Sequence, residues 1–135
     1  MDYAGTNYVA VFAAAVAAWL FGAAWYGLLG RQWMKAAKLD PAGMKMSAVP
    51  FIISFVCELI MAFVLAGAIG HLGTGQVTAW NGIVSAAILW AGFVATTLVV
   101  NHRYQNTGWD LTLIDGGHWL GVALIMGAII GWFGA

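Results

Sequence analysis

Four apolar runs, each about the 20 residues that a transmembrane α-helix needs, limit the fold of this chain more than any other feature. They cover residues 8–30, 49–69, 79–100 and 111–133. A helix satisfies its own backbone hydrogen bonds in lipid, and strand-like alternation of polar and apolar residues is absent. We therefore expect an all-α polytopic membrane protein, a bundle of four transmembrane helices forming one domain over residues 1–135.

Composition argues against a soluble globular domain. Charged residues make up 7% of the chain and hydrophobic residues 63%, whereas soluble domains carry about 25% charged residues. So few charges cannot cover a soluble surface, and the lipid bilayer is the expected surrounding. The net charge is zero, which gives no reason to expect nucleic acid as a partner. The one cysteine, Cys57, lies in an apolar run and cannot form an internal disulfide.

The positive charges are distributed unevenly between the two sides of such a bundle. All five Lys and Arg residues lie in residues 31–48 and 101–110, which connect the first run to the second and the third to the fourth. Lys and Arg are enriched in cytoplasmic loops, so both connections are expected in the cytoplasm and both termini outside. The five residues are Arg31, Lys35, Lys38, Lys45 and Arg103.

Local signals predict how the runs are connected. Asp40 before Pro41 is typical of an N-cap followed by proline at the first helical position. The first helix is therefore expected to continue through Arg31 and Lys35 and to end before Pro41. Residues 70–78 form a short, glycine-rich connection, which predicts that the second and third spans are neighbours. Aromatic residues are expected to anchor the cytoplasmic side at the level of the headgroups: Trp25, Tyr26, Trp33 and Trp109.

Small residues recur every fourth position on all four runs. Helices in lipid associate through close contact of such residues, so these faces are expected to pack helices within the chain, and at least one of them is a candidate for packing subunits. The third run carries Ala87, Ala91 and Ala95 on one face. The predicted packing residues are Gly22, Gly27, Gly30, Ala62, Ala66, Gly117 and Gly121.

Glu58 is the strongest functional candidate, because it lies within about 3 Å of the middle of the second run at 1.5 Å rise per residue. A charged carboxylate there costs about 2.5–3.5 kcal/mol on the insertion scale, and acidic residues inside membranes often serve function. Glu58 shares a helical face with Ser54, Ala62 and Ala66, so it is expected to face another helix. Two interpretations stay open: a hydrogen bond that ties helices together, or a proton or cation pathway.

Asp115 and His118 stand three residues apart near the start of the fourth run and share a helical face. They are expected either to form a local pair or to relay protons towards Glu58. A metal site built from these three residues is weakly indicated, because their spacing matches no ligand motif; neither a metal nor a cofactor is predicted.

The segment from Gly22 to Met34, GAAWYGLLGRQWM, resembles the signature of the DUF1761 family, small uncharacterised bacterial membrane proteins with four spans. A second similar region runs from Val100 through the fourth run and includes Leu111 to Asp115. The resemblance implies a four-span fold in a bacterial inner membrane, and it implies no activity and no catalytic residue. The positions that match the signature are Gly22, Trp25, Tyr26, Gly27, Gly30 and Trp33.

Three functional hypotheses follow. The first is a structural or accessory subunit, either a homo-oligomer or part of a larger membrane complex, because small-residue faces are abundant and no soluble domain is predicted. The alternative is a small oligomeric proton-coupled transporter or channel that uses Glu58. A membrane enzyme using Asp115 and His118 is the weakest, because no nucleophile or phosphate-binding loop accompanies them; the chain is therefore not predicted to be an enzyme.

Overall fold

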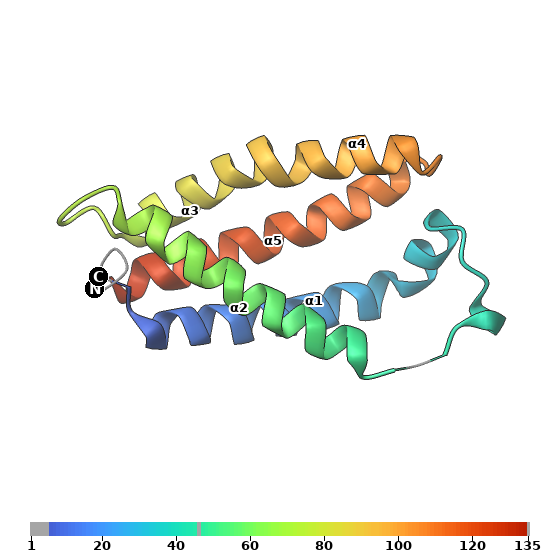
Figure 1. Cartoon of the computed structure of the whole chain (residues 1–135), viewed down its shortest axis with the longest axis horizontal. Helices are drawn as coiled ribbons and strands as arrows, with labels where there is room; N and C mark the ends of the chain where they lie inside the picture. Colours follow the sequence, from blue (N-terminus) through green and yellow to red (C-terminus); the bar gives the residue numbers. More distant parts are fainter. Residues whose placement is uncertain (1–5, 46, 135) are drawn as a thin grey trace.

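The computed structural model describes residues 6–45 and 47–134, which are helical apart from their connections and contain no strand (Figure 1). Four helical segments are long and apolar enough to cross a membrane: Tyr8–Ala36, Val49–Gly70, Ala79–Tyr104 and Trp109–Phe133. The all-α, four-span prediction is confirmed. The elements are α1 (Tyr8–Ala36), η2 (Pro41–Gly43), α2 (Val49–Gly70), α3 (Ala79–Leu89), η3 (Trp90–Ala95), α4 (Thr96–Tyr104) and α5 (Trp109–Phe133).

The third span is interrupted by a π-helical stretch. η3 joins α3 to α4 without a turn, so the three elements form one segment, Ala79–Tyr104. Stretches of this kind are rare and widen the helix locally.

Helix α5 is the centre of the bundle (Figure 1). It packs most closely against α3 and α1, while α2 packs mainly on α1 and touches α3 and α5 little. The expected pairing of the second and third spans is therefore limited, although a short connection joins them. The backbones of α3 and α5 approach closely through glycines: a Cβ added to Gly82 of α3 would overlap the carbonyl oxygen of Gly127, and one added to Gly131 of α5 would overlap that of Thr78.

Both connections that carry Lys and Arg lie at the same end of the bundle, opposite the start of α1 and the end of α5 (Figure 1). The two connections touch, because Nζ of Lys38 donates to the backbone carbonyl of Asn106 at 2.6 Å. Lys38 and Asn106 both adopt left-handed backbone conformations, with φ 58° and 57°. Lys38 lies just beyond the end of α1 and Asn106 just beyond the end of α4, where left-handed residues commonly terminate helices.

Local capping fixes the helix starts. The side chain of Asn7 accepts from Ala10 N at 3.1 Å at the start of α1, and Oγ1 of Thr78 accepts from Asn81 N at 3.1 Å at the start of α3. Oδ1 of Asp40 accepts from Ala42 N at 3.0 Å. Asp40 therefore caps η2 with Pro41 at its first position, as predicted, and α1 ends at Ala36.

The predicted small-residue faces differ in what they contact. On α2, Ala62 and Ala66 are buried. On α5, a Cβ added to Gly121 would overlap the ring of Phe21, and one added to Gly117 would lie 3.0 Å from the ring of Trp25. Gly27 and Gly30 differ from these, because a Cβ at either would meet nothing within 4 Å.

Candidate functional site

A polar cluster centred on Asp115 joins α1, α4 and α5 near the end that carries the positive charges. The hydroxyl of Tyr26 donates to Oδ1 of Asp115 at 2.6 Å. Nε2 of His102 lies 3.5 Å from Oδ2 of the same carboxylate. Each carboxylate oxygen thus faces a group from a different helix, and the cluster ties three spans together.

Thr112 orients the imidazole of His102 from the other side. Its Oγ1 accepts from Nη2 of Arg103 at 2.9 Å and lies 2.8 Å from Nδ1 of His102. Because the hydroxyl oxygen already accepts from Arg103, its own proton is available for Nδ1 of His102. When the hydroxyl of Thr112 donates to Nδ1, the N–H of His102 is on Nε2, which faces Asp115.

Arg103 holds the turn between α4 and α5. Its Nη2 donates to the backbone carbonyls of Thr107 at 3.2 Å and Gly108 at 3.0 Å. The guanidinium carbon lies 3.7 Å from the centre of the Trp109 ring, a cation–π geometry. Trp109, a predicted anchor, is 59% exposed and covers this arginine at the end of the bundle.

His118 lies one turn further into the bundle, enclosed by aromatic rings. Its ring centre is 4.8 Å from that of Tyr26, 4.6 Å from that of Trp119 and 6.2 Å from that of Phe21. A Cβ added to Gly22 would lie 2.7 Å from Nε2 of His118, so this position of the imidazole requires a glycine on α1. Nδ1 of His118 is buried without a hydrogen-bond partner.

The hydrogen-bonding partners of Asp115 come from other helices than its own. Asp115 accepts from Tyr26 and faces His102, and no hydrogen bond to His118 is present in the part of the chain that the structure describes. Sequence reasoning missed His102 and Thr112 as members of the site. No spacing signal could have joined Tyr26 to Asp115, because 89 residues separate them.

Two tryptophans hold the backbone of α5 on either side of Asp115. Nε1 of Trp25 donates to the carbonyl of Ile114 at 3.1 Å, and Nε1 of Trp90 donates to the carbonyl of Gly116 at 3.0 Å. Trp25 and Tyr26, predicted as headgroup anchors, therefore direct their polar atoms into the bundle. Trp33 packs edge-on against Tyr26 with ring centres 5.9 Å apart.

Glu58 lies apart from this cluster. Its side chain is 1% exposed, and Oε2 accepts from Oγ of Ser54, one turn away on α2, at 3.0 Å. Oε1 is buried without a partner. Among the described residues no group of three His, Cys, Asp or Glu side chains could hold a metal ion, so Glu58, Asp115 and His118 are not brought together as ligands.

Comparison with known proteins gives a family but no activity. The model of a family described as a protein of unknown function (DUF1761) matches residues 9–131. No curated protein and no solved structure matches the chain.

Proposed function

Since this chain belongs to the DUF1761 family, whose function is unknown, we propose a role from its own structure: a structural or accessory subunit of a membrane assembly. The chain assembles with copies of itself or joins a larger complex. The third span forms the contact surface. The observation that carries this proposal is that the chain itself buries few residues of this span.

The third span differs from the other three in burial. Within the most apolar stretch of each span, 6% of the residues of Ala79–Tyr104 are buried, against 33% in each other span. Its buried residues in α3 are Gly82 and Ala86, and η3 has none. Apart from these two residues and His102 in α4, the residues of this span are half-buried or exposed, so they can contact lipid or another chain.

The outward face of η3 has the chemistry of a helix interface. Ala91 and Gly92 are exposed there, and a Cβ added to Gly92 would meet nothing within 4 Å. Oγ1 of Thr96 donates to the carbonyl of Gly92 at 2.9 Å, and Oγ1 of Thr97 donates to that of Phe93. Small residues with internally bonded hydroxyls let a neighbouring helix approach closely in lipid.

Two glycine variants test this proposal. Gly92→Leu adds a large side chain to the open face without a clash inside the chain, so the folded chain is expected to persist while the assembly in bilayers dissociates. Gly27→Leu is the matched control, because Gly27 is equally open on α1. Assembly is measured by energy transfer between labelled chains in liposomes. If Gly27→Leu dissociates the assembly and Gly92→Leu does not, the third span is not the contact surface.

The proposed location is a bacterial inner membrane, with the connections at residues 31–48 and 101–110 in the cytoplasm and both ends of the chain outside. It is supported by the four apolar spans and by the placement of both positively charged connections at one end of the bundle.

A second candidate is a small proton-coupled transporter or channel built around Glu58. The unpartnered oxygen of this buried carboxyl group favours it, because a group without a fixed partner can bind and release a proton. Glu58→Gln is then expected to abolish proton-linked flux in liposomes while the assembly remains intact. An enzyme using Asp115 and His118 has less support, because Asp115 is occupied by Tyr26 and His102 while aromatic rings enclose His118.

A further inference from the structure

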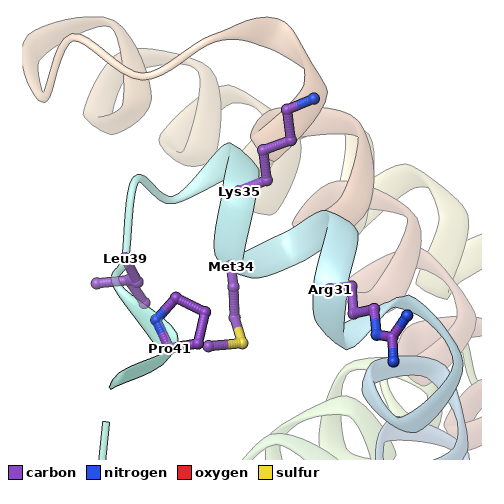
Figure 2. Close-up of a pocket in the computed structure, with 5 residues that line it drawn as sticks. All are labelled: Arg31, Met34, Lys35, Leu39 and Pro41. Carbon is purple, nitrogen blue, oxygen red and sulfur yellow. The ribbon is translucent and has the colours of Figure 1, made fainter. Parts of the chain in front are cut away.

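A hollow of about 620 Å³ lies at the corner where α1 ends and the chain turns into η2 (Figure 2). Its position is at the end of the apolar part of α1, at the boundary between the hydrocarbon core and the headgroups when the bundle spans a bilayer. The residues that line it are Arg31, Met34, Lys35, Leu39 and Pro41.

The lining combines an apolar floor with two cations. Figure 2 shows the side chain of Met34 directed at Pro41, with Leu39 close by. Arg31 and Lys35 stand one helical turn apart on the flank of the same hollow. Apolar surface next to positive charge at this depth matches the two parts of a phospholipid, the upper acyl chain and the phosphate group.

The positive charge at this corner is not neutralised by the protein. Within residues 6–45 and 47–134 no Lys or Arg side chain lies within ion-pair distance of a carboxylate, and the one basic side chain that does is His102, beside Asp115. Asp40, the acidic residue of this corner, uses Oδ1 to cap η2 through Ala42 N. Lys38 is held by the carbonyl of Asn106. Arg31 and Lys35 therefore keep their charge available for an anion.

The backbone around the hollow is fixed by local bonds. Leu39 N donates to the carbonyl of Met34 at 2.9 Å, which closes the end of α1. Lys38 at φ 58° then redirects the chain, and Asp40 caps the next turn. The backbone of the corner is thus preformed, and binding has to order only side chains.

We propose that this corner binds an anionic phospholipid, with the phosphate between Arg31 and Lys35 and the upper acyl chain against Met34, Leu39 and Pro41. In the structure the charged ends of Arg31 and Lys35 point away from the apolar floor (Figure 2). Binding therefore needs rotation about their side-chain bonds, which breaks no ion pair with a carboxylate. Each cation near an anionic lipid surface contributes about 1 kcal/mol, which corresponds to about a fivefold change in affinity.

The test measures binding of phosphatidylglycerol and phosphatidylcholine to the full chain by native mass spectrometry from detergent micelles. The wild-type chain is expected to bind one phosphatidylglycerol in preference to phosphatidylcholine. Arg31→Gln and Lys35→Gln are each expected to weaken that binding about fivefold. Lys45→Gln is the matched control, because it removes the same charge from the same connection outside the hollow, and it is expected to change binding less than twofold.

Three results would overturn the proposal. Equal binding of phosphatidylglycerol and phosphatidylcholine would show that the charges of Arg31 and Lys35 do not contribute to binding. Equal loss in Lys45→Gln and Lys35→Gln would show a diffuse surface effect with no site. Displacement of phosphatidylglycerol by millimolar inorganic phosphate would show a simple anion site. Helicity measured by circular dichroism accompanies each variant, and Lys35→Gln alone decides the matter if Arg31→Gln does not fold.

Discussion

The hydroxyl of Tyr26 lies 2.6 Å from Oδ1 of Asp115 and joins the first span to the last across 89 residues of sequence. Nε2 of His102 faces the other oxygen of the same carboxylate at 3.5 Å. Three of the four spans are therefore tied at one point near the positively charged end. The remaining span, α2, is held through its packing on α1.

Tyr26→Phe tests this point directly. The change removes one hydrogen bond to a carboxylate that is partly withdrawn from solvent, and bonds to charged groups contribute about 1.5–3 kcal/mol. We expect a loss of that size in the free energy of unfolding, measured by denaturant titration in mixed micelles. Tyr104→Phe is the control, because Tyr104 is 86% exposed and its loss should change stability by less than about 0.5 kcal/mol. Equal losses in the two variants would contradict a structural role of the Tyr26–Asp115 bond.

Gly22→Ala should destabilise the bundle because the new methyl group would lie 2.7 Å from Nε2 of His118. The imidazole is enclosed by aromatic rings and cannot move away freely, and overpacking of this kind costs about 1–3 kcal/mol. Gly27→Ala, five residues later on the same helix, meets open space. It should leave stability unchanged or raise it by up to about 1 kcal/mol through helix propensity. Thermal unfolding of both variants in detergent measures the difference in their stability. Equal stability of the two variants would show that His118 does not lie against Gly22.

Gly82→Ala should separate α3 from α5. The added methyl group would overlap the backbone carbonyl of Gly127, which no side-chain rotation can relieve. We expect the largest loss of stability among the glycine variants, above about 3 kcal/mol, since the backbones themselves must move apart. Gly27→Ala, which is open on α1, should cost nothing measurable. A distance measurement between spin labels on α3 and α5 would show the separation, and unchanged distances and stability in Gly82→Ala would disprove the close contact.

The proposed orientation predicts which loops are accessible from outside a cell. With Cys57→Ser as background, Lys45→Cys should react with a membrane-impermeant maleimide in inverted vesicles and stay unlabelled in intact cells. Thr74→Cys, in the connection between α2 and α3, should show the opposite pattern. The physical reason is the retention of Lys and Arg on the cytoplasmic side. Reversed labelling of the two positions would show that the bundle is inserted the other way.

Local chemistry made part of this structure predictable. The four spans follow from the length of the apolar runs, and the cap at Asp40–Pro41 is a property of two adjacent residues. The choice between neighbouring small-residue faces was not predictable. Ala87, Ala91 and Ala95 form a regular stripe, yet α3 buries Gly82 and Ala86, one position away, because the rotation of a helix is set by its partner.

The contacts of the candidate site were likewise only partly predictable from the sequence. The sequence makes Asp115 a candidate because it shares a helical face with His118 near the start of an apolar run. Its partners, Tyr26 and His102, come from two other spans. Their identity depends on which helices pack together and in which register. The spacing of residues along one helix determines neither.

Native mass spectrometry of the wild-type chain, extracted gently from its own membrane, tests the central claim most directly. If the chain is a subunit, the mass is two or more times 14.3 kDa, or that of a complex that contains other chains, because a partner covers the third span. A single chain accompanied only by lipid, at the concentration found in the membrane, would contradict the proposed role as a subunit.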